Sequence, residues 1–360
     1  MRRSKVLQLS RRRLLASAGA ASAALAAPAV WTSASAQNRT LFVRDPGGPF
    51  TKGFGDAYYE PFRKETGIEV VGIVSGAEPT SQIKSMVDTK TYTWDIAGGI
   101  SMTAAVQLRK EGDYIEKHGL DKDPVVQEIP SDYRDEYVIG SDVYTTALGY
   151  RKDTFKDKVP TSWNDYYDLA GFKGRRVMRK HPFDSVEIAL MADGVTKDKV
   201  YPCDLDRAFR KMDQLKSNVS AWWTSGAQAT QMLATGEADM LPVWANRIQA
   251  AIDQGAPVGI MWDANIWGLD VWAILKGGPK VEIAKEFIRF TCDAKRQAAT
   301  TTVLTNGPTN PNAYKHIDAE RAKVLSTYPA YRAGSVAIND AFWAGNKDKA
   351  IERFNDWVLK

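Results

Sequence analysis

The segment from residue 240 to residue 275, MLPVWANRIQAAIDQGAPVGIMWDANIWGLDVWAIL, decides how the rest of the chain is interpreted. Its two ends, residues 240–244 and 271–275, are rich in apolar and aromatic residues and predict strands. Residues 245–254 between them predict a helix. The segment therefore predicts a strand, a helix and a second strand in succession, as in an α/β protein.

The same segment carries four tryptophans and an acid that could form a binding site: Trp244, Trp262, Trp267, Trp272 and Asp270. Aromatic faces attract a positive charge, and a partly desolvated carboxylate pairs strongly with an ammonium group. These residues together indicate a site for an organic cation. The alternative is that the tryptophans belong to the core and that Asp270 lies in a turn.

Composition sets the limits for the remainder of the chain. The chain has 360 residues, 44% of them hydrophobic, which is enough for two domains with substantial cores. The formal net charge is +5, but residues 1–36 hold six basic residues and no acid, so the remainder carries −1. We therefore expect neither nucleic acid nor an anionic membrane as a partner.

The first 36 residues resemble a twin-arginine export signal. SRRRLL (residues 10–15) precedes an Ala-rich run, and ASA (residues 34–36) is a small-x-small cleavage site. A membrane anchor is the alternative, but the apolar run is too short to span a bilayer. We expect cleavage after Ala36 and a soluble periplasmic protein that begins at Gln37.

Two cysteines, Cys203 and Cys292, remain for the oxidising periplasm. A disulfide between them could stabilise the fold by roughly 4 kcal/mol in the chain-entropy model. Two separate buried thiols are the alternative, and the sequence leaves both open.

The mature chain alternates apolar runs with amphipathic ones. The first part predicts strands and helices in strict alternation, at residues 41–43, 50–66, 68–74, 81–90 and 94–97. A second α/β unit follows, with extended runs near residues 142–150, 175–178 and 238–243 and helices at 184–193, 204–215 and 228–236. This order predicts a mostly parallel sheet with helices on both faces.

Blocks along nearly the whole mature chain resemble the bacterial extracellular solute-binding proteins of ABC importers, specifically the spermidine/putrescine-binding branch. The blocks are PFRKETGIEV (61–70), TWDI (93–96), YPCDLDRAF (201–209), WWTSGAQ (222–228), GEADM (236–240) and GPTN (307–310). The resemblance implies a two-lobed α/β periplasmic-binding-protein fold of type II, each lobe a mostly parallel sheet flanked by helices, with a hinge between the lobes.

We expect the ligand in the cleft between these lobes, beyond the carboxyl ends of the strands. The expected lobes are residues 37–143 with 246–306 and residues 144–245 with 307–360. The chain is expected to cross between them near residues 143–149, 243–246 and 306–309.

The resemblance also implies individual ligand contacts. Asp270 matches the acid that anchors an amino group in the polyamine binders, Trp244 matches an aromatic residue of the cleft, and Trp267 lies one position from the other aromatic. Asp184 and Glu187, three residues apart on one helix face, match a carboxylate pair that receives the far amine. Favourable placement of acids at a helix N-terminus is the alternative for this pair.

Four further residues are candidates for polar contacts. Ser225 and Gly226 open a helix whose free backbone N–H groups suit an anionic group, with a plain N-cap as the alternative. Asp95, in the third predicted strand, and Ser101, after it, could contact the ligand from the first lobe; a helix cap is the alternative.

Gly47 and Gly48 stand where the close relatives have aromatic residues that sandwich the polyamine chain. This departure opens space and removes stacking surface. It leaves an amino acid, an opine or a thiamine-like cation as alternatives to a polyamine.

Catalytic motifs are scarce. His118, His181 and His316 stand in no HExxH pattern, and the chain has no G-x-S-x-G elbow or Walker loop. Tyrosine pairs at 58–59 and 166–167 leave ferric ion as an alternative ligand, although packing within helices explains them more simply. We expect no metal, no cofactor and no enzymatic activity, with a periplasmic hydrolase as the distant alternative.

The sequence therefore predicts a monomeric periplasmic substrate-binding component of an ABC transporter. It captures a small amine-bearing solute, of the putrescine/spermidine class or a zwitterion, and passes it to an inner-membrane permease.

Overall fold

The computed structural model describes residues 39–76 and 79–360, of which residues 40–360 form one compact unit. The predicted signal of residues 1–36, its cleavage after Ala36 and the start at Gln37 lie outside the described residues. Within residues 39–76 and 79–360, no helix is both long enough and apolar enough to cross a membrane.

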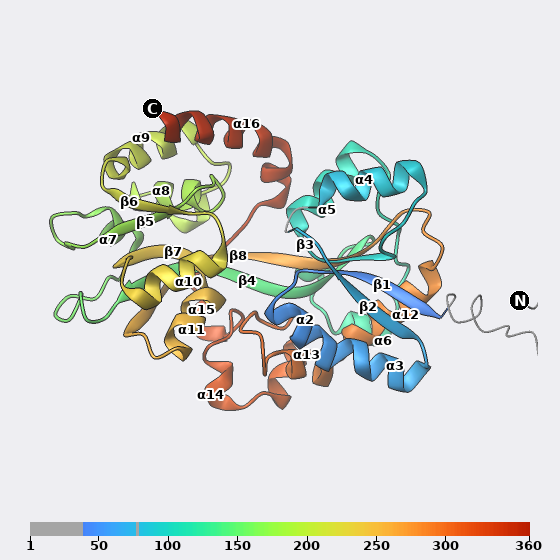
Figure 1. Cartoon of the computed structure of the whole chain (residues 1–360). Coiled ribbons are helices and arrows are strands. Elements are labelled where there is room, and N and C mark those ends of the chain that lie inside the picture. Colours follow the sequence, from blue (N-terminus) through green and yellow to red (C-terminus); the bar gives the residue numbers. More distant parts are fainter. Residues whose placement is uncertain (1–38, 77–78) are drawn as a thin grey trace, which may run out of the picture. The chain divides into compact units, whose positions relative to one another are not determined.

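One mixed sheet runs through the whole unit, and the described residues contribute nine strands to it in the order β2-β1-β3-β8-β4-β7-β5-β6, with β9 paired to β8 (Figure 1). The strands are β1 (Thr40–Asp45), β2 (Glu69–Val74), β3 (Ile96–Ser101), β4 (Val138–Arg151), β5 (Arg176–Arg179), β6 (Val219–Trp223), β7 (Met240–Trp244), β8 (Val258–Ile274) and β9 (Val336–Ala337). β1 pairs in parallel with β2 and β3, and β5 pairs in parallel with β6 and β7. Each half of the sheet thus has the parallel core that the alternation of strands and helices predicts.

Strands β4 and β8 belong to both halves. They run antiparallel over a long register, from Val138 opposite Ala273 to Arg151 opposite Val258. β3 pairs with the C-terminal part of β8, whereas β7 pairs with the C-terminal part of β4. The sequence predicted only residues 271–275 as the second strand of the opening segment. The strand begins earlier, at Val258, because β4 supplies hydrogen-bond partners along its length.

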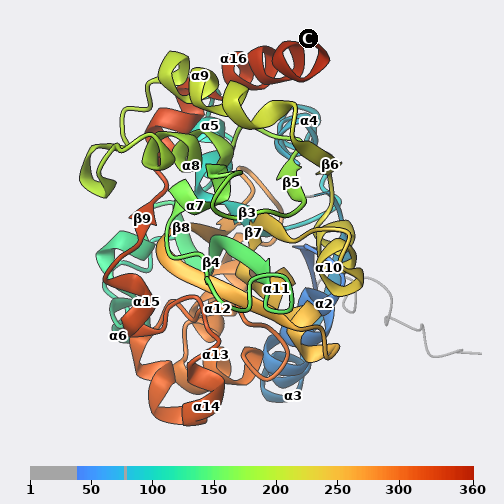
Figure 2. The ribbon, with the colours of Figure 1, turned by 90° about the vertical axis from the view of Figure 1, so that its left-hand side faces the viewer.

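Helices cover both faces of each half (Figure 2). The longer ones are α3 (Glu60–Thr66), α4 (Thr80–Thr89), α5 (Met102–Glu111), α8 (Ser185–Ala192), α9 (Leu205–Lys216), α10 (Gly226–Thr235), α11 (Ala245–Asp253), α12 (Val281–Thr291), α13 (Ala294–Thr300) and α16 (Asp340–Leu359). The short ones are α2 (Pro49–Phe54), α6 (Pro124–Gln127), α7 (Trp163–Tyr167), α14 (Ala319–Ala322) and α15 (Pro329–Arg332).

Four apolar clusters form the core, one on each face of each half. In the first half, Phe62 and Phe287 pack beneath one face, and Ile83 and Leu108 pack on the other. In the second half, α8, α9 and α16 cover one face, and α10 and α11 cover the other. This is a mixed α/β architecture with helices on both faces of each half, as expected. The lobe boundaries given above stay a prediction; α11, which they assign to lobe 1, packs against Val177 and Trp223.

The two cysteines lie in different clusters and are both free thiols. Cys203 packs with α9 in the second half, and Cys292 packs against the first half. Burial raises the pKa of the Cys292 thiol to about 12 and that of Cys203 further. The sequence left open a disulfide or two separate buried thiols, and the structure shows two separate buried thiols.

Candidate functional site

A cavity of about 250 Å³ lies where β4 and β8 pass from one half of the sheet to the other. Its wall includes residues at or just after the carboxyl ends of parallel strands from both halves: Gly47, Ser101, Arg179 and Trp244. Ligands of open α/β sheets bind at such ends, because loops and helix starts converge there. This cavity is therefore the candidate ligand site.

Four of the nine residues predicted as ligand contacts line this cavity: Asp270, Trp244, Asp184 and Ser101. Asp270 and Ser101 are register partners on β8 and β3, so they approach the cavity from the same position along the sheet. Asp184 precedes α8 in a left-handed backbone conformation, with φ of 66°. Few non-glycine residues adopt a positive φ, although Asp does so more readily than most.

The other five predicted contacts do not line the cavity. Trp267 packs against the ring of Tyr133 and under the Arg332 guanidinium, 3.7 Å from its ring centre. It lies three residues from Asp270 on the same strand, and successive side chains of a strand alternate between faces. Asp95 precedes β3, at the end opposite Ser101, where it accepts hydrogen bonds from the Phe42 backbone N–H and Lys280.

Glu187 lies behind Asp184 in the core of the second half. Its carboxylate accepts hydrogen bonds from the Tyr201 hydroxyl at 2.5 Å and from Trp343 Nε1 at 2.6 Å. Burial, together with the neighbouring charge of Asp184, raises the pKa of Glu187 to about 7. The predicted carboxylate pair is thus divided between the cavity wall and the core.

Ser225 and Gly226 lie at the start of α10. Ser225 is the N-cap, since its hydroxyl accepts a hydrogen bond from the Gln228 backbone N–H at 3.3 Å. Gly226 is buried against the side chain of Arg247, which does line the cavity. Ser225 and Gly226 are therefore connected to the site only through Arg247, which was not among the predicted contacts.

Three arginines, none of them among the predicted contacts, line the cavity: Arg44, Arg179 and Arg247. Arg44 donates to four backbone carbonyl oxygens, those of Ser75, Gly76, Gly98 and Gly99, and so joins the segment after β2 to the irregular part of β3. Two of these arginines could have been found from the sequence. Arg179 is a basic residue at the end of an apolar strand, and Arg247 follows shortly after the end of another.

Arg179 occupies the kind of environment that the sequence predicted for a ligand cation. Its guanidinium carbon lies 5.1 Å from the ring centre of Trp244 and 5.3 Å from that of Trp223. Its Nη1 is 3.1 Å from Asp184 Oδ2. Two indole faces and a carboxylate do surround a cation here, but the cation belongs to the protein.

In the part of the chain that the structure describes, Arg247 has neither an ion pair like that of Arg179 nor carbonyl contacts like those of Arg44. It lies in the first turn of α11, half-buried, and its side chain has no ion pair with any described residue. Its Nε is buried without a hydrogen-bond partner among the described residues. Burial lowers the pKa of its guanidinium. A half-buried guanidinium with such a donor can accept an anionic group beside it.

A chain of hydrogen bonds links the cavity wall to the shared strands. Asn246 Nδ2 donates to Asn306 Oδ1 at 2.8 Å, and Asn306 Nδ2 donates to Asp142 on β4. Ser141 Oγ donates to the other Asp142 oxygen at 2.9 Å. Burial raises the pKa of Asp142. The network joins α11, β4 and the segment at 306, and it fixes both asparagines at the cavity.

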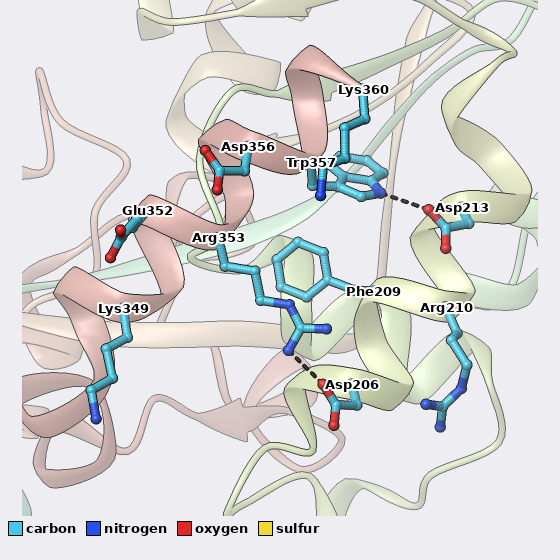
Figure 3. Close-up of a pocket in the computed structure, with 10 residues that line it drawn as sticks. All are labelled: Asp206, Phe209, Arg210, Asp213, Lys349, Glu352, Arg353, Asp356, Trp357 and Lys360. Carbon is cyan, nitrogen blue, oxygen red and sulfur yellow. Dashed lines mark hydrogen bonds and ion pairs between the residues drawn. The ribbon is translucent and has the colours of Figure 1, made fainter.

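A second hollow, of about 450 Å³, lies between α9 and α16 (Figure 3). It is lined by four acidic and four basic side chains, so it carries no net charge that would select a ligand. Arg353 pairs with Asp206 at 2.6 Å, and Trp357 Nε1 donates to Asp213 at 2.7 Å across the groove (Figure 3). These contacts close the two helices onto each other, which is the structural role that we assign to the groove.

The tyrosine pairs lie in cores. Tyr58 packs against Phe54 and Trp272, and Tyr59 donates to Asp45 Oδ2 at 3.2 Å. Tyr166 and Tyr167 are buried in the second half. In the described parts of the chain, no cluster of three or more His, Cys, Asp or Glu side chains could hold a metal ion.

Comparison with known proteins gives the family. A family model described as bacterial extracellular solute-binding protein matches residues 57–332. The chain is 30% identical over 335 residues to a gamma-aminobutyric acid-binding protein of Pseudomonas aeruginosa, covering 91% of this chain and 93% of the relative. The chain belongs to the bacterial extracellular solute-binding protein family, and it is of the type that forms the substrate-binding component of an ABC transporter.

Solved structures agree with this assignment. An ABC transporter substrate-binding protein from Bradyrhizobium japonicum superposes with a TM-score of 0.83 at 33% identity, covering 88% of this chain and 98% of that one. A GABA receptor structure superposes with a TM-score of 0.80 at 32% identity, covering 89% and 97%. The expected family is thus confirmed. These comparisons do not single out the spermidine/putrescine branch that the sequence blocks resembled.

Proposed function

We propose that this protein captures a small zwitterion with one ammonium and one carboxylate group, of the γ-amino acid class, in the cavity between the halves of its sheet. The observation that carries the proposal is how two arginines of the cavity wall, Arg179 and Arg247, are paired. Arg179 already fills the aromatic and acidic surroundings that suit a cation, and Arg247 has no anionic partner.

The charges of the wall support a ligand with a carboxylate. Three arginines and two aspartates line the cavity, which leaves an excess of one positive charge. A diamine would add two positive charges to this wall, at a cost that increases as the site excludes water. A zwitterion can place its carboxylate at Arg247 and its ammonium at Asp270, so that both charges are paired.

The remaining wall suits a short alkyl chain. Phe50, Phe183 and Trp244 provide apolar surface, and Tyr144, Asn246 and Asn306 provide polar groups. The volume is below the roughly 300–1,000 Å³ typical of sites for drug-sized ligands. A molecule with only a few heavy atoms fits this space better than a long polyamine.

The names of the relatives point to the same chemistry, since two of them bind γ-aminobutyric acid. We further propose that the protein is exported, works in the periplasm and delivers its ligand to an inner-membrane ABC permease without making or breaking a bond. A polyamine, as the sequence resemblance implied, is the competing ligand for the same Asp270 and Trp244.

Isothermal titration calorimetry on the purified chain from Gln37 tests the proposal. The ligands are γ-aminobutyrate, its neutral amide 4-aminobutyramide, butyrate and putrescine. We expect γ-aminobutyrate to bind at least about tenfold more tightly than any of the other three, because only it can place a carboxylate at Arg247 and an ammonium group at Asp270 together. Tighter binding of putrescine would establish the polyamine function instead.

A further inference from the structure

We propose that Gly226 positions Arg247 and thereby determines the preference of the site for a carboxylate. This inference rests on the proposed function, in which Arg247 receives the ligand carboxylate. Gly226 itself does not line the cavity and acts only through the arginine.

The first argument is the space that this glycine leaves. A Cβ atom at position 226 would lie 2.5 Å from Arg247 Nε, 3.0 Å from its Cδ and 3.2 Å from its Cγ. Real side chains do not approach so closely, so the arginine would have to move. The backbone of Gly226 is not in the left-handed region, and alanine is a better helix former than glycine at the start of α10. Glycine is therefore needed at position 226 because it leaves room for the Arg247 side chain.

The second argument is that α10 holds the backbone of Arg247 in place. The Thr230 hydroxyl of α10 donates to the Arg247 carbonyl oxygen at 3.1 Å. Ile248 and Ala251 of α11 share a buried cluster with Ala229 and Leu233 of α10. The two helices are thus packed together, and a Cβ at 226 displaces the guanidinium rather than the helix.

The third argument is electrostatic. The guanidinium lies against the first residue of α10, where the helix carries partial positive charge. A cation at this end of a helix is disfavoured, and Arg247 has no ion pair with a described residue that would compensate. Both the guanidinium and the helix end favour an anionic group beside them. In the proposed function, the ligand carboxylate supplies that group.

The Gly226→Ala variant tests the inference by calorimetry. We expect its affinity for γ-aminobutyrate to fall at least about tenfold, while its affinity for 4-aminobutyramide, which lacks the charge, stays within about twofold of wild type. A general defect of folding would lower both affinities together. Gly345→Ala in α16 is the matched control, because a Cβ there meets nothing within 4 Å, and it should leave both affinities unchanged.

A double-mutant cycle separates an effect through Arg247 from an independent one. Arg247→Gln alone should lower γ-aminobutyrate affinity at least as much as Gly226→Ala. Adding Gly226→Ala to Arg247→Gln should then cause no further loss. Additive losses in the cycle, or an unchanged affinity of Gly226→Ala, would overturn the inference.

A crystal structure of the ligand-free Gly226→Ala variant, compared with wild type, tests the positioning without any ligand. We expect the Arg247 side chain in a new rotamer and the α10 backbone in place. An unmoved Arg247 with a shifted α10 would disprove the positioning role. If wild type binds no γ-amino acid, the proposed function fails, and the crystal structures still decide whether Gly226 positions the arginine.

Discussion

At the scale of single residues, the cleft contains a cation of its own where the sequence suggested a ligand cation. The indole of Trp244 and the carboxylate of Asp184 are both engaged by the Arg179 guanidinium. Cation–π and ion-pair contacts of this kind are available to a tethered guanidinium at a smaller cost in entropy than to a free ligand. In the function that we propose, Trp244 and Asp184 therefore hold a cation of the protein, and Asp270 is left to receive the ligand ammonium.

This interpretation makes a prediction for Arg179→Gln. The substitution exposes the face of Trp244 and leaves Asp184 without its cationic partner. We expect putrescine affinity to rise by roughly tenfold and γ-aminobutyrate affinity to fall, because the wall changes from an excess of positive charge to balance. Calorimetry with both ligands measures the change in preference. Parallel losses for both ligands would show that Arg179 has only a structural role.

Asp270 is the residue that we expect to bind the ammonium group. Asp270→Asn removes the charge with little change of shape, and we expect γ-aminobutyrate affinity to fall by about 2–5 kcal/mol if the pair is desolvated. The matched control is Asp263→Asn on the same strand, an exposed residue paired with Lys197 at 2.7 Å. Equal affinities for the two variants would remove Asp270 from the site.

At the scale of elements, α5 and α16 join the two halves on one side of the cavity. Thr103 of α5 lines the cavity, and its hydroxyl donates to Asp340 Oδ1 in the first turn of α16 at 2.7 Å. α5 packs in a cluster of the first half, and α16 packs in one of the second half. This hydrogen bond therefore fastens one half to the other beside the ligand site.

Thr103→Val tests how much this contact contributes. Valine keeps the shape but removes the hydroxyl donor, so the largely buried Asp340 carboxylate loses one of its hydrogen bonds. We expect the free energy of unfolding in urea to fall by about 1–3 kcal/mol, and ligand affinity to fall with it. Thr302→Val, on an exposed helix end where the hydroxyl donates to Ala299, is the control and should change stability by under about 0.5 kcal/mol. A Thr103→Val protein as stable as this control would show that the contact does not join the halves.

At the scale of the whole molecule, buried acids make stability depend on pH. Burial raises the pKa of Glu187 to about 7 and that of Asp340 to about 6. Between the ordinary pKa of a glutamate, about 4.5, and 7, the folded protein holds a proton on Glu187 that the unfolded chain has released. This contribution to stability is therefore lost as the pH rises through that window. His181, whose pKa burial lowers to about 3, acts in the opposite direction below pH 6.5.

Because these groups oppose each other, the prediction concerns the difference between Glu187→Gln and wild type. We expect the stability of the variant relative to wild type to be highest near pH 8, where the variant avoids a buried charge. This relative stability should decrease as the pH falls to 5. Thermal unfolding between pH 5 and pH 8 measures this difference. A constant offset at all pH values would show that Glu187 does not titrate in this range.

Much of the fold could be predicted from the sequence, because it depends on local periodicity. The alternating strands and helices of residues 40–111 and the sequence of β7 and α11 follow from the spacing of apolar residues. The full length of β8 does not follow from this spacing, because residues 258–270 form a strand only through pairing with β4. Whether Cys203 and Cys292 meet also depended on which cluster each one joins.

For the site, the sequence by itself determined which kinds of side chain are present, an acid and indoles in one segment, and that this segment alternates strand and helix as in an α/β protein. Only the tertiary structure decided which of them face one another. Trp267 lies on the other face of its strand from Asp270, and Glu187 is packed in the core, away from the cavity that Asp184 lines. Contacts between segments 60 or more residues apart place Arg179 and Arg247 at the same wall. Charge pairing is a property of distance in space, so the ionic partners within the cleft could not be read from spacing along the chain.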